Sequence, residues 1–597
     1  MPDAAGHVDF FAFHPEAGGL LFCGWTTHEA VPLMHTGEFV ARFAGGEARG
    51  MGMATFYVRE GLEARGMGMV LFVECDARPE GALIAVAPAD LQAVETRPTR
   101  ATRELEPDAA AAMLQPLIRR GDPALPGVIL DALLPPKPTP VAAPMERATI
   151  TAEPARNLDE LGDKVMLQLD EAIFCLPAGV VLIGWCLARP GALEELRLRS
   201  GAAVTRIDLA RAIRVARPGV IDSVGRAHGH EDVRKGFMAY LPDGFDPSAV
   251  NALEVLTREG EVGTRAIPKP RLHGLPAIRH LLGECDAQYA DVAPAFDHVL
   301  GPAVARLNAE RLSEKGDVAR IDFGPRPEAP PATIVIPLHG RTDFAELQCA
   351  LFVADPALAG CEIVYVLDDP KLRREVENLA GSIHARLGLS LTLLAHERNL
   401  GFAPACNTGL TMARGRKTCF LNSDAFPTAP GWLAALGARL DADPTLGIVG
   451  PLMLHEDGSV QHEGMEFRSL PQFAGWRFGH HTNLGRRPSG AGGLTRHPAI
   501  TGACMVIDTL RARAMGGFDE AYVMGDFEDS DLCLRAAARG LGCAVDRDVR
   551  LVHFGRRSQP SANERWRMNL ILHNAWVHQG RWGETIAAMS RAVGRAA

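Results

Sequence analysis

The segment Thr418-Cys419-Phe420-Leu421-Asn422-Ser423-Asp424 is a short apolar run that ends directly in polar residues. Three similar runs precede it, and stretches with helical spacing separate them. The strand-like runs are 333–337, 362–367 and 391–394, and the helical stretches are 344–352 and 404–413. This alternation predicts an α/β domain with a mostly parallel sheet and helices on its faces.

Ligands of such sheets bind beyond the carboxyl ends of the strands, so acids that directly follow a strand are the first candidates for a site. Asp368 and Asp369 follow one run, and Asp424 follows another. No phosphate-cradling P-loop and no G-x-G-x-x-G after the first strand occur. A nucleotide bound here would therefore need Mg²⁺ or Mn²⁺, to which Asp424 is placed to supply a carboxylate. The alternative is that Asp424 only caps the turn into Pro427.

Further short motifs surround this strand in a fixed order. They are Asn399-Leu400-Gly401-Phe402-Ala403-Pro404-Ala405-Cys406-Asn407-Thr408-Gly409, Gly447-Ile448-Val449-Gly450-Pro451, Asp457-Gly458-Ser459-Val460-Gln461-His462-Glu463-Gly464, Thr501-Gly502-Ala503-Cys504, Gly516-Gly517-Phe518-Asp519-Glu520, Glu528-Asp529-Ser530-Asp531-Leu532-Cys533-Leu534-Arg535 and His553-Phe554-Gly555-Arg556-Arg557-Ser558. The ordered set resembles the family 2 glycosyltransferases, in the branch of rhamnosyl- and galactofuranosyl-transferase-like enzymes. The resemblance covers roughly residues 333–558.

The resemblance implies a GT-A fold and an inverting transfer from a nucleotide-diphosphate sugar to a glycan or lipid-linked acceptor. It assigns several residues to the nucleotide and donor pocket: Asp368, Asn399, Gly401, Asn407, Asn422, Asp424 and Gly502. Gln461 and His462 are expected to border the donor sugar or the acceptor. Trp476 is either a ring that stacks on a sugar face or a core aromatic, which is the commoner role for a tryptophan.

The resemblance also implies a metal site. Asp424 matches the last acid of the family's D-x-D motif, whereas Asn422 replaces the first, and His553 matches a histidine that completes the metal site in some relatives. One carboxylate contributes less charge than two, so the strictness of metal dependence stays open.

Glu528 and Asp529 match the acidic pair that supplies the catalytic base. An acceptor hydroxyl is a poor nucleophile until a carboxylate takes its proton, and we assign that role to Asp529, with Glu528 orienting it or contacting the acceptor. The alternative is a solvated acidic helix start that the helix dipole favours. Asp531 and Arg535 lie four residues apart and are expected to form an ion pair.

The N-terminal half contains what looks like a diverged repeat, and the alternative is that two Gly-Trp pairs fall in similar settings by chance. Asp9 precedes Gly24-Trp25 at nearly the same spacing at which Asp170 precedes Gly184-Trp185, and an apolar run comes before each Gly-Trp pair. Apolar runs separated by Gly and Pro turns predict two β-rich, sandwich-like domains. The expected organisation is a β-rich domain at 1–100, a linker at 101–160, a second β-rich domain at 161–268, a helical connector at 269–331 and the GT-A domain with C-terminal helices at 332–597.

Composition limits the function classes. The chain has 597 residues, of which 47% are hydrophobic and 22% charged, which is typical of several folded domains. A net charge of -10 argues against nucleic acid as a partner. The 12 cysteines form no C-x-x-C pair, and no leader or long apolar run occurs, so free thiols and a cytoplasmic location are expected.

Alternatives stay open both for the C-terminal tail and for the function of the whole protein. The tail beyond Asn563 looks helical, and it either packs on the catalytic domain or lies on a membrane surface with Arg565, Arg567 and Arg581 outward. The whole protein is a glycosyltransferase of cell-surface polysaccharide synthesis, or a catalytically silent carbohydrate-binding scaffold. A nucleotidyltransferase is disfavoured because 337–341 is a poor triphosphate loop. The donor sugar, the linkage and the oligomeric state are not fixed by the motifs.

Overall fold

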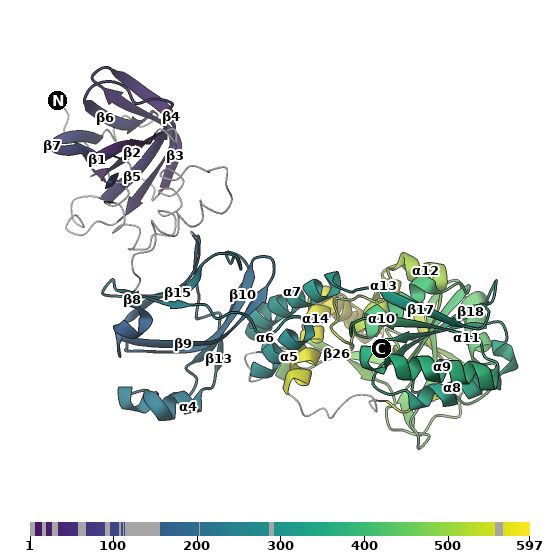
Figure 1. The fold of residues 1–597 in the computed structure, drawn as a ribbon. Coiled ribbons are helices and arrows are strands. Elements are labelled where there is room, and N and C mark those ends of the chain that lie inside the picture. Colours follow the sequence, from purple (N-terminus) through teal and green to yellow (C-terminus); the bar gives the residue numbers. More distant parts are fainter. Residues whose placement is uncertain are drawn as a thin grey trace. The chain divides into compact units, whose positions relative to one another are not determined.

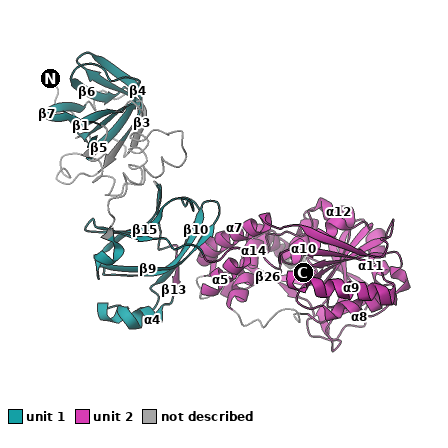
Figure 2. Ribbon diagram, in the orientation of Figure 1, with its two compact units in different colours: residues 1–210, 216–270 teal, residues 211–215, 271–597 magenta. Residues whose placement is uncertain are grey.

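The computed structural model describes residues 6–14, 19–26, 34–57, 67–89, 96–106, 109–110, 113, 156–201, 203–285, 292–555 and 565–596. The chain divides into two compact units, unit 1 with residues 1–210 and 216–270, and unit 2 with residues 211–215 and 271–597 (Figure 2). Most of the predicted linker, including its proline-rich part, and Arg556, Arg557 and Ser558 lie outside the described residues.

The first part of unit 1 is a closed β-barrel, not the predicted sandwich. Its strands are β1 (Gly6–His14), β2 (Gly19–Thr26), β3 (Met34–Phe43), β4 (Gly46–Tyr57), β5 (Met67–Glu74), β6 (Leu83–Pro88) and β7 (Thr96–Glu104). They follow the order β1-β2-β5-β4-β3-β6-β7 (Figure 1). The barrel closes because β1 pairs antiparallel with β2 and parallel with β7. Period-2 alternation predicts strands but does not say whether the last strand returns to the first.

The second part of unit 1 contains two separate sheets, as expected of a sandwich-like domain. Strands β9 (Val165–Cys175), β10 (Gly179–Ala188) and β14 (Gly236–Leu241) lie side by side and antiparallel. The other sheet has the order β12-β11-β15-β16-β8. Its strands are β8 (Arg156–Asn157), β11 (Leu193–Ser200), β12 (Ala203–Arg206), β15 (Asn251–Thr257) and β16 (Val262–Ala266), and the short elements β13 (Ile213–Val215) and α4 (Pro218–Val220) follow β12.

The two Gly-Trp hairpins share one irregularity. In β1–β2 the register shifts between Val8 and Phe10, and in β9–β10 it shifts between Ile183 and Gly184, so Asp9 and Asp170 are the extra residues of two β-bulges. A Cβ on Gly24 would lie 2.1 Å from a carbonyl oxygen of the facing strand, and a Cβ on Gly184 would lie 2.2 Å from the equivalent oxygen. Each bulge therefore requires the glycine. The recurrence of the same bulge at the same motif position supports the proposed duplication.

Unit 2 opens with helices that the spacing predicted. They are α5 (Gly274–Glu284), α6 (Val292–Ala295) and α7 (Gly301–Ser313). Ile278, Leu281 and Leu282 on α5 are buried, as are Val304 and Leu307 on α7, so each helix buries apolar residues that recur at helical spacing. The last helix, α14 (Arg565–Ala596), packs against α5 and α7. The tail thus packs within unit 2, and in the described residues no helix combines the length and apolarity needed to span a bilayer.

The sheet of unit 2 has the order β17-β20-β19-β18-β21-β28-β23-β29-β22, with β24 beside β23 and β27 beside β29. Its strands are β17 (Val318–Phe323), β18 (Ala332–Leu338), β19 (Glu362–Leu367), β20 (Leu391–His396), β21 (Lys417–Leu421), β22 (Ala425–Pro427), β23 (Leu446–Leu454), β24 (Val460–His462), β27 (Leu494–His497), β28 (Cys504–Asp508) and β29 (Gly542–His553), and β25 (Met465–Ser469) pairs separately with β26 (Arg477–His481). The four predicted strands β18 to β21 run parallel. The later half is mixed, because β28 is antiparallel to both of its neighbours.

One boundary of the prediction is wrong. Residues 318–323, placed in the helical connector, form β17, which pairs antiparallel with β20 at the edge of the sheet. The residues of β17 are alternately exposed and partly buried, so its sequence lacks the continuous apolar run of the central strands.

Helices cover both faces of this sheet. They are α8 (Asp343–Val353), α9 (Arg373–Leu387), α10 (Phe402–Met412), α11 (Trp432–Ala442), α12 (Thr509–Ala514) and α13 (Glu528–Ala537). Ile334 and Ile336 pack in one core with α8, α9 and α11, whereas Val335 between them packs in a second core with α10, α12 and α13. The two-residue alternation along β18 therefore builds a three-layer domain, consistent with the predicted GT-A fold.

Candidate active site

The site residues gather where β18, β19, β20 and β21 end. Two loops meet there: the turn 399–401 after β20, and the loop 522–527 before α13. The amide of Phe402 donates to the carbonyl oxygen of Met524 at 2.8 Å. Gly401 has φ 98°, and a Cβ on it would lie 2.8 Å from Cα of Met524, so only glycine allows this approach.

Asp368 organises the turn after β20. Its Oδ1 accepts from the amide of Leu400 and from Nδ1 of His396, each at 2.8 Å, and its Oδ2 accepts from the amide of Gly401 at 2.6 Å. The side chain is buried. Both oxygens are thus bonded within the protein and hold the turn 399–401, while the predicted contact of Asp368 with the nucleotide stays a prediction.

Asn399, in contrast, has unused hydrogen-bonding capacity. Its Oδ1 is buried and makes no hydrogen bond with the part of the chain that the structure describes. Buried amide oxygens normally have a partner. Asn399 therefore stays a candidate for contact with the donor.

Asn407 lies on α10, and both ends of its side-chain amide are hydrogen-bonded within the protein. Its Nδ2 donates to the carbonyl of Phe518 at 2.8 Å and to Glu520, while its Oδ1 accepts from the amide of Phe518 at 2.9 Å. These bonds hold the turn 516–520 against α10. The geometry gives Asn407 a structural role, and its predicted place in the nucleotide pocket stays a prediction.

Asp424, Asn422 and His553 converge at the end of β21. Nε2 of His553 lies 3.1 Å from Oδ1 of Asp424 and 3.3 Å from Nδ2 of Asn422. Gln461 holds the other side of the ring, with its Oε1 2.5 Å from Nδ1 of His553 and its Nε2 donating to the His553 carbonyl at 2.8 Å. A proton on Nδ1 therefore leaves a lone pair on Nε2 facing Asp424. Gln461 acts on His553, and the predicted sugar contact of Gln461 remains untested.

Asp529 is held at the start of α13 by two backbone amides. Its Oδ2 accepts from Gly502 at 2.9 Å and its Oδ1 from Ser530 at 2.7 Å, and the side chain stays partly exposed. His462 supports the same strand end, because its Nε2 accepts from the amide of Thr501 at 3.1 Å. His462 is buried, and burial followed by the charges of neighbouring histidines keeps its pKa well below the usual range, so this acceptor is neutral.

A hydrogen bond connects the two halves of the site. The amide of Asn422 donates to the carbonyl of Ala503 at 2.9 Å, because β21 and β28 pair up to Leu421 and Cys504. Asp529 is bonded to Gly502, one residue before Ala503. The predicted base and the predicted metal ligands therefore lie at one edge of the sheet.

The acidic pair has two different environments. Glu528 is buried, and its Oε2 makes no hydrogen bond within the described ranges. Burial, and then the charges of Asp529 and Asp526, raise the pKa of Glu528 far above its ordinary value. Burial also raises the pKa of Asp529, but the amides of Gly502 and Ser530 oppose the shift. Two carboxyls whose environments separate their pKa values can divide the acid and base roles.

The alternative of a solvated acidic helix start is wrong. Asp531 is fully buried and accepts from Arg535 at 2.6 Å, which confirms the predicted pair. Arg581 and Trp582 of α14 also donate to Asp531. Arg581 therefore does not point outward, as the membrane-surface hypothesis required.

Trp476 is a core aromatic and not a ring that stacks on a sugar. It is buried and makes a T-shaped contact with Phe296.

Residues of the connector also hold the site, which the sequence did not indicate. Arg311 on α7 donates to the carbonyl of Asn399 at 3.0 Å, and Asn308 donates to the carbonyl of Glu520 at 3.0 Å. Both are polar residues on the buried face of α7, beside Val304 and Leu307. A polar residue at a buried position of a helix indicates a hydrogen-bond partner, because buried polar groups need one, and this could have identified Asn308 and Arg311.

Arg341 is a further residue near Asp424. Its hydrogen bond to Asp343, and to a smaller degree the charge of Asp424, raise the pKa of Arg341. The guanidinium lies over the ring of Phe344, 4.3 Å from its centroid. Arg341 follows the first strand of the sheet, and ligands bind where such strands end, so its cationic group is a candidate to face a phosphate.

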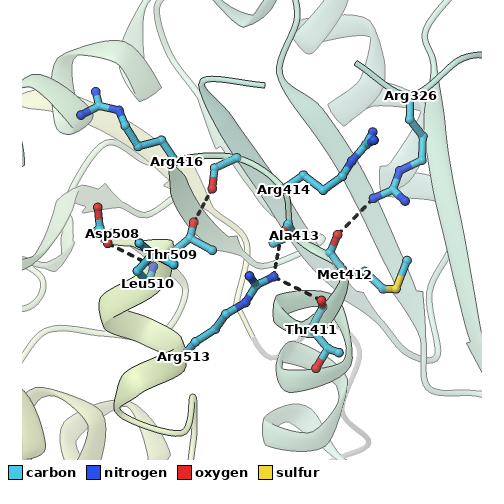
Figure 3. A pocket seen from close by; sticks show the side chains of 11 residues that line it. Arg326, Thr411, Met412, Ala413, Arg414, Arg416, Asp508, Thr509, Leu510 and Arg513 are labelled. Atoms are coloured by element: carbon cyan, nitrogen blue, oxygen red, sulfur yellow. Dashed lines mark hydrogen bonds between the residues drawn. The ribbon is translucent and has the colours of Figure 1, made fainter. Parts of the chain in front are cut away.

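A cavity of about 550 Å³ lies at the other end of the strands and is not this site. Four arginines line it (Figure 3), but each is engaged by other groups of the protein. Arg326 and Arg414 bind Glu362, Arg416 binds Asp441, and Arg513 donates to the carbonyls that end α10. These arginines tie the sheet to its helices.

Residues 333–497 match the family model described as Glycosyl transferase family 2. The resemblance to that family is thereby confirmed for this region. Glu528, Asp529 and His553 lie beyond the matched residues. All 12 cysteines are described, and none of them forms a disulfide.

Two curated relatives and two solved structures are similar. The O-antigen biosynthesis protein RfbC of Myxococcus xanthus is 24% identical over 381 residues, 60% of this chain and 28% of that protein. The uncharacterized protein y4gI of Sinorhizobium fredii (strain NBRC 101917 / NGR234) is 26% identical over 222 residues, 36% of this chain and 23% of that protein. The chain thus spans about a quarter of the length of these relatives.

The structures are GalNAc-T7 with UDP, GalNAc and Mn²⁺, and the mannosyltransferase PcManGT from Pyrobaculum calidifontis with GDP-Man and Mn²⁺. The first has 17% identity and a TM-score of 0.31, and the match covers 37% of this chain and 43% of that chain. The second has 20% identity and a TM-score of 0.29, and the match covers 54% of this chain and 87% of that chain.

Proposed function

We propose that unit 2 is an inverting glycosyltransferase, which moves a sugar from a nucleotide-diphosphate donor to a hydroxyl of a glycan or lipid-linked acceptor. The family match over residues 333–497 supports the reaction class. The observation that carries the proposal is Asp529, partly exposed and fixed by two amides at the sheet edge where Asn422, Asp424 and His553 meet.

Asp529 is the proposed base. As the acceptor oxygen attacks the anomeric carbon, the carboxylate takes the hydroxyl proton, the bond from the anomeric carbon to the diphosphate oxygen breaks, and the diphosphate leaves with that electron pair. A base opposite the leaving group gives inversion. A raised pKa makes the Asp529 carboxylate a stronger base, provided that it is ionised at the working pH. Burial raises the pKa of Glu528 further than that of Asp529, which favours the neutral form of Glu528 over that of Asp529.

The residues at the end of β21 fit a divalent cation such as Mg²⁺ or Mn²⁺. Asp424 and Nε2 of His553 would hold it. Asn422 adjoins them through its Nδ2, and its Oδ1 is buried and makes no hydrogen bond in the described residues. Within the part of the chain that the structure describes, no group of three or more His, Cys, Asp or Glu is arranged to hold a metal ion. Two ionisable ligands suit a cation that also binds substrate phosphates. When bound, it would neutralise charge on the diphosphate.

The acceptor class and pathway are further proposals. A relative named as an O-antigen biosynthesis protein supports a role in cell-surface polysaccharide synthesis. Peripheral association with a membrane and a cytoplasmic location stay predictions. The competing function is a silent carbohydrate-binding scaffold, which Asn422 in place of an acid favours and the divided acid pair disfavours.

A donor screen tests the proposal. The full chain is incubated with UDP-, GDP- and dTDP-sugars, with Mn²⁺, Mg²⁺ or EDTA, and release of the nucleoside diphosphate is measured. We expect release from at least one donor, and a loss of at least 100-fold in Asp529→Asn with unchanged thermal unfolding and nucleotide binding. Full activity of Asp529→Asn would remove it from the base role. No release from any donor, with or without sugar acceptors, would favour the scaffold.

A further inference from the structure

We infer that the C-terminal helix α14 is a part of the catalytic unit, and that Asn574 on it is a positioning residue for Asp529. The inference rests on the proposed function. Asn574 lies beyond the residues that match the family model, and none of the sequence motifs includes it.

Asn574 grips the loop before α13 with its whole amide group. Its Oδ1 accepts from the amide of Val523 at 3.0 Å, and its Nδ2 donates to the carbonyls of Val523 at 3.1 Å and Gly525 at 2.6 Å. The side chain is completely buried. These three hydrogen bonds add to the few backbone bonds of this irregular loop, such as the one from the amide of Gly525 to the carbonyl of Val523.

The gripped loop is strained. Met524, Asp526 and Phe527 have φ values of 65°, 76° and 75°, in the left-handed region that non-glycine residues rarely adopt. Such backbone persists only where surrounding contacts determine it. Phe527 is the residue directly before α13, so the conformation of this loop sets where Glu528 and Asp529 begin.

The same stripe of α14 continues along α13. Nε2 of His578 lies 3.1 Å from Oγ of Ser530, which itself donates to the carbonyl of Phe527 at 3.0 Å. Trp582 donates to Oδ1 of Asp531 at 2.8 Å. Residues 574, 578 and 582 recur every four positions and so share one face of the helix. That face follows the chain from Val523 to Asp531, with Asp529 between its contacts.

The helix offers a matched control. Asn569 is also buried, and its Nδ2 also donates to two carbonyls, Leu282 at 2.7 Å and Cys285 at 3.0 Å. Those carbonyls belong to α5 and its end, not to the loop before α13. Asn569→Ala and Asn574→Ala therefore remove similar bonds from one helix, but only the second acts on the base.

The test compares both variants in the full chain by thermal unfolding, by hydrogen exchange and by donor turnover. We expect similar losses of Tm. Only Asn574→Ala should lower kcat, by 10-fold or more, with the donor KM within about 2-fold, because a displaced base weakens chemistry and not donor binding. Only Asn574→Ala should speed amide exchange across residues 522–531. Equal loss of kcat in both variants, or unchanged kcat in Asn574→Ala, would overturn the positioning role.

Hydrogen exchange separates this inference from the proposed function. If the wild-type protein turns over no donor, faster exchange at 522–531 in Asn574→Ala alone still supports the grip of α14 on the loop, and unchanged exchange overturns it. If Asn574→Ala does not fold, Ser530→Ala replaces it. That variant cuts the His578 link but keeps the amide that binds Asp529, and it should show the same split between kcat and KM. A wild-type kcat in Ser530→Ala would then contradict the inference.

Discussion

The amide nitrogen of Gly502 donates a hydrogen bond of 2.9 Å to Oδ2 of Asp529. A Cβ on Gly502 would lie 3.2 Å from Cβ of Asp529, which is closer than ordinary van der Waals contact. The residue that fixes the proposed base therefore leaves no room for a side chain. Because Asn422 is bonded to Ala503, the same strand end also connects the base to the proposed metal ligands.

Replacement of Gly502 by alanine should displace Asp529 by a few tenths of an ångström. We expect kcat for sugar transfer to fall by about 10-fold, since reacting groups must be placed within a fraction of an ångström. The donor KM and the Tm should change little, because the added methyl group is too close only to Asp529 and makes an ordinary contact with Phe402. Steady-state kinetics and thermal unfolding check this. A kcat equal to that of the wild type would mean that the carboxylate does not need this position.

Glu528→Gln should stabilise the protein at alkaline pH. The pKa of Glu528 is raised in the folded state, so the folded protein holds a proton that the unfolded chain releases. The stability contributed by this proton is complete below the ordinary pKa of about 4.5 and is lost as pH rises through the folded value. Glutamine mimics the protonated form and removes that loss. Urea unfolding at pH 5 and pH 8 should show a gain on the order of 1–3 kcal/mol that is larger at pH 8.

The same variant tests the division of roles. If Asp529 is the base and Glu528 is neutral, Glu528→Gln should keep a substantial share of kcat, at least about a tenth. A loss as large as that of Asp529→Asn would instead place the proton transfer on Glu528. The comparison needs both variants measured with the same donor and acceptor.

Asn422→Asp should strengthen binding of Mn²⁺. The substitution adds a second carboxylate beside Asp424 and Nε2 of His553, at the position of an amide oxygen that has no partner in the described residues. Hard divalent cations bind carboxylates more strongly than neutral amides. We expect at least a 10-fold lower Kd by calorimetry without substrate, and a weaker Kd in Asp424→Asn. Identical Mn²⁺ affinities in all three proteins would show that the cation does not bind here.

The sheet was predictable where local patterning is strong. Residues 333–337, 362–367, 391–394 and 418–421 are continuous apolar runs and lie in four adjacent parallel strands. β17 was missed, because an edge strand needs an apolar residue only at alternate positions and its sequence reads VARIDF. The closure of the barrel was also missed, since β1 and β7 are distant in sequence and local patterning carries no information on their pairing.

The candidate site was predictable as a place, but less well as a set of roles. Strand ends and motifs led to Asp424, Asp529 and His553, which the fold brings to one edge of the sheet. Motifs do not reveal whether a polar side chain is already hydrogen-bonded within the protein, as the side chains of Asp368 and Asn407 are. Nor do they reveal distant supports such as Asn574, whose role depends on the docking of a helix 51 residues after Val523.

His573 should limit the stability of unit 2 in acid. Its ring is completely buried on α14, and neither ring nitrogen makes a hydrogen bond to any described residue. Burial lowers its pKa from 6.5 to about 3. The unfolded chain therefore takes up a proton below pH 6.5 that the folded protein refuses. The contribution of His573 to the free energy of unfolding is therefore unchanged above pH 6.5, and the free energy of unfolding decreases as the pH falls from 6.5 towards 3.

His573→Leu should remove this loss. At pH 5 the variant should exceed the wild type by roughly 2 kcal/mol, since each pH unit below 6.5 is worth about 1.4 kcal/mol. At pH 7.5 it should be neutral or slightly more stable, because leucine removes two unsatisfied polar atoms. His578→Leu is the contrasting control: burial lowers the pKa of His578 to about 4, but His578 contacts Oγ of Ser530, so its loss should destabilise the protein at pH 7.5. Denaturant unfolding of both variants from pH 5 to 7.5 checks this, and a His573→Leu curve parallel to that of the wild type would show that His573 is protonated or solvated in the folded protein.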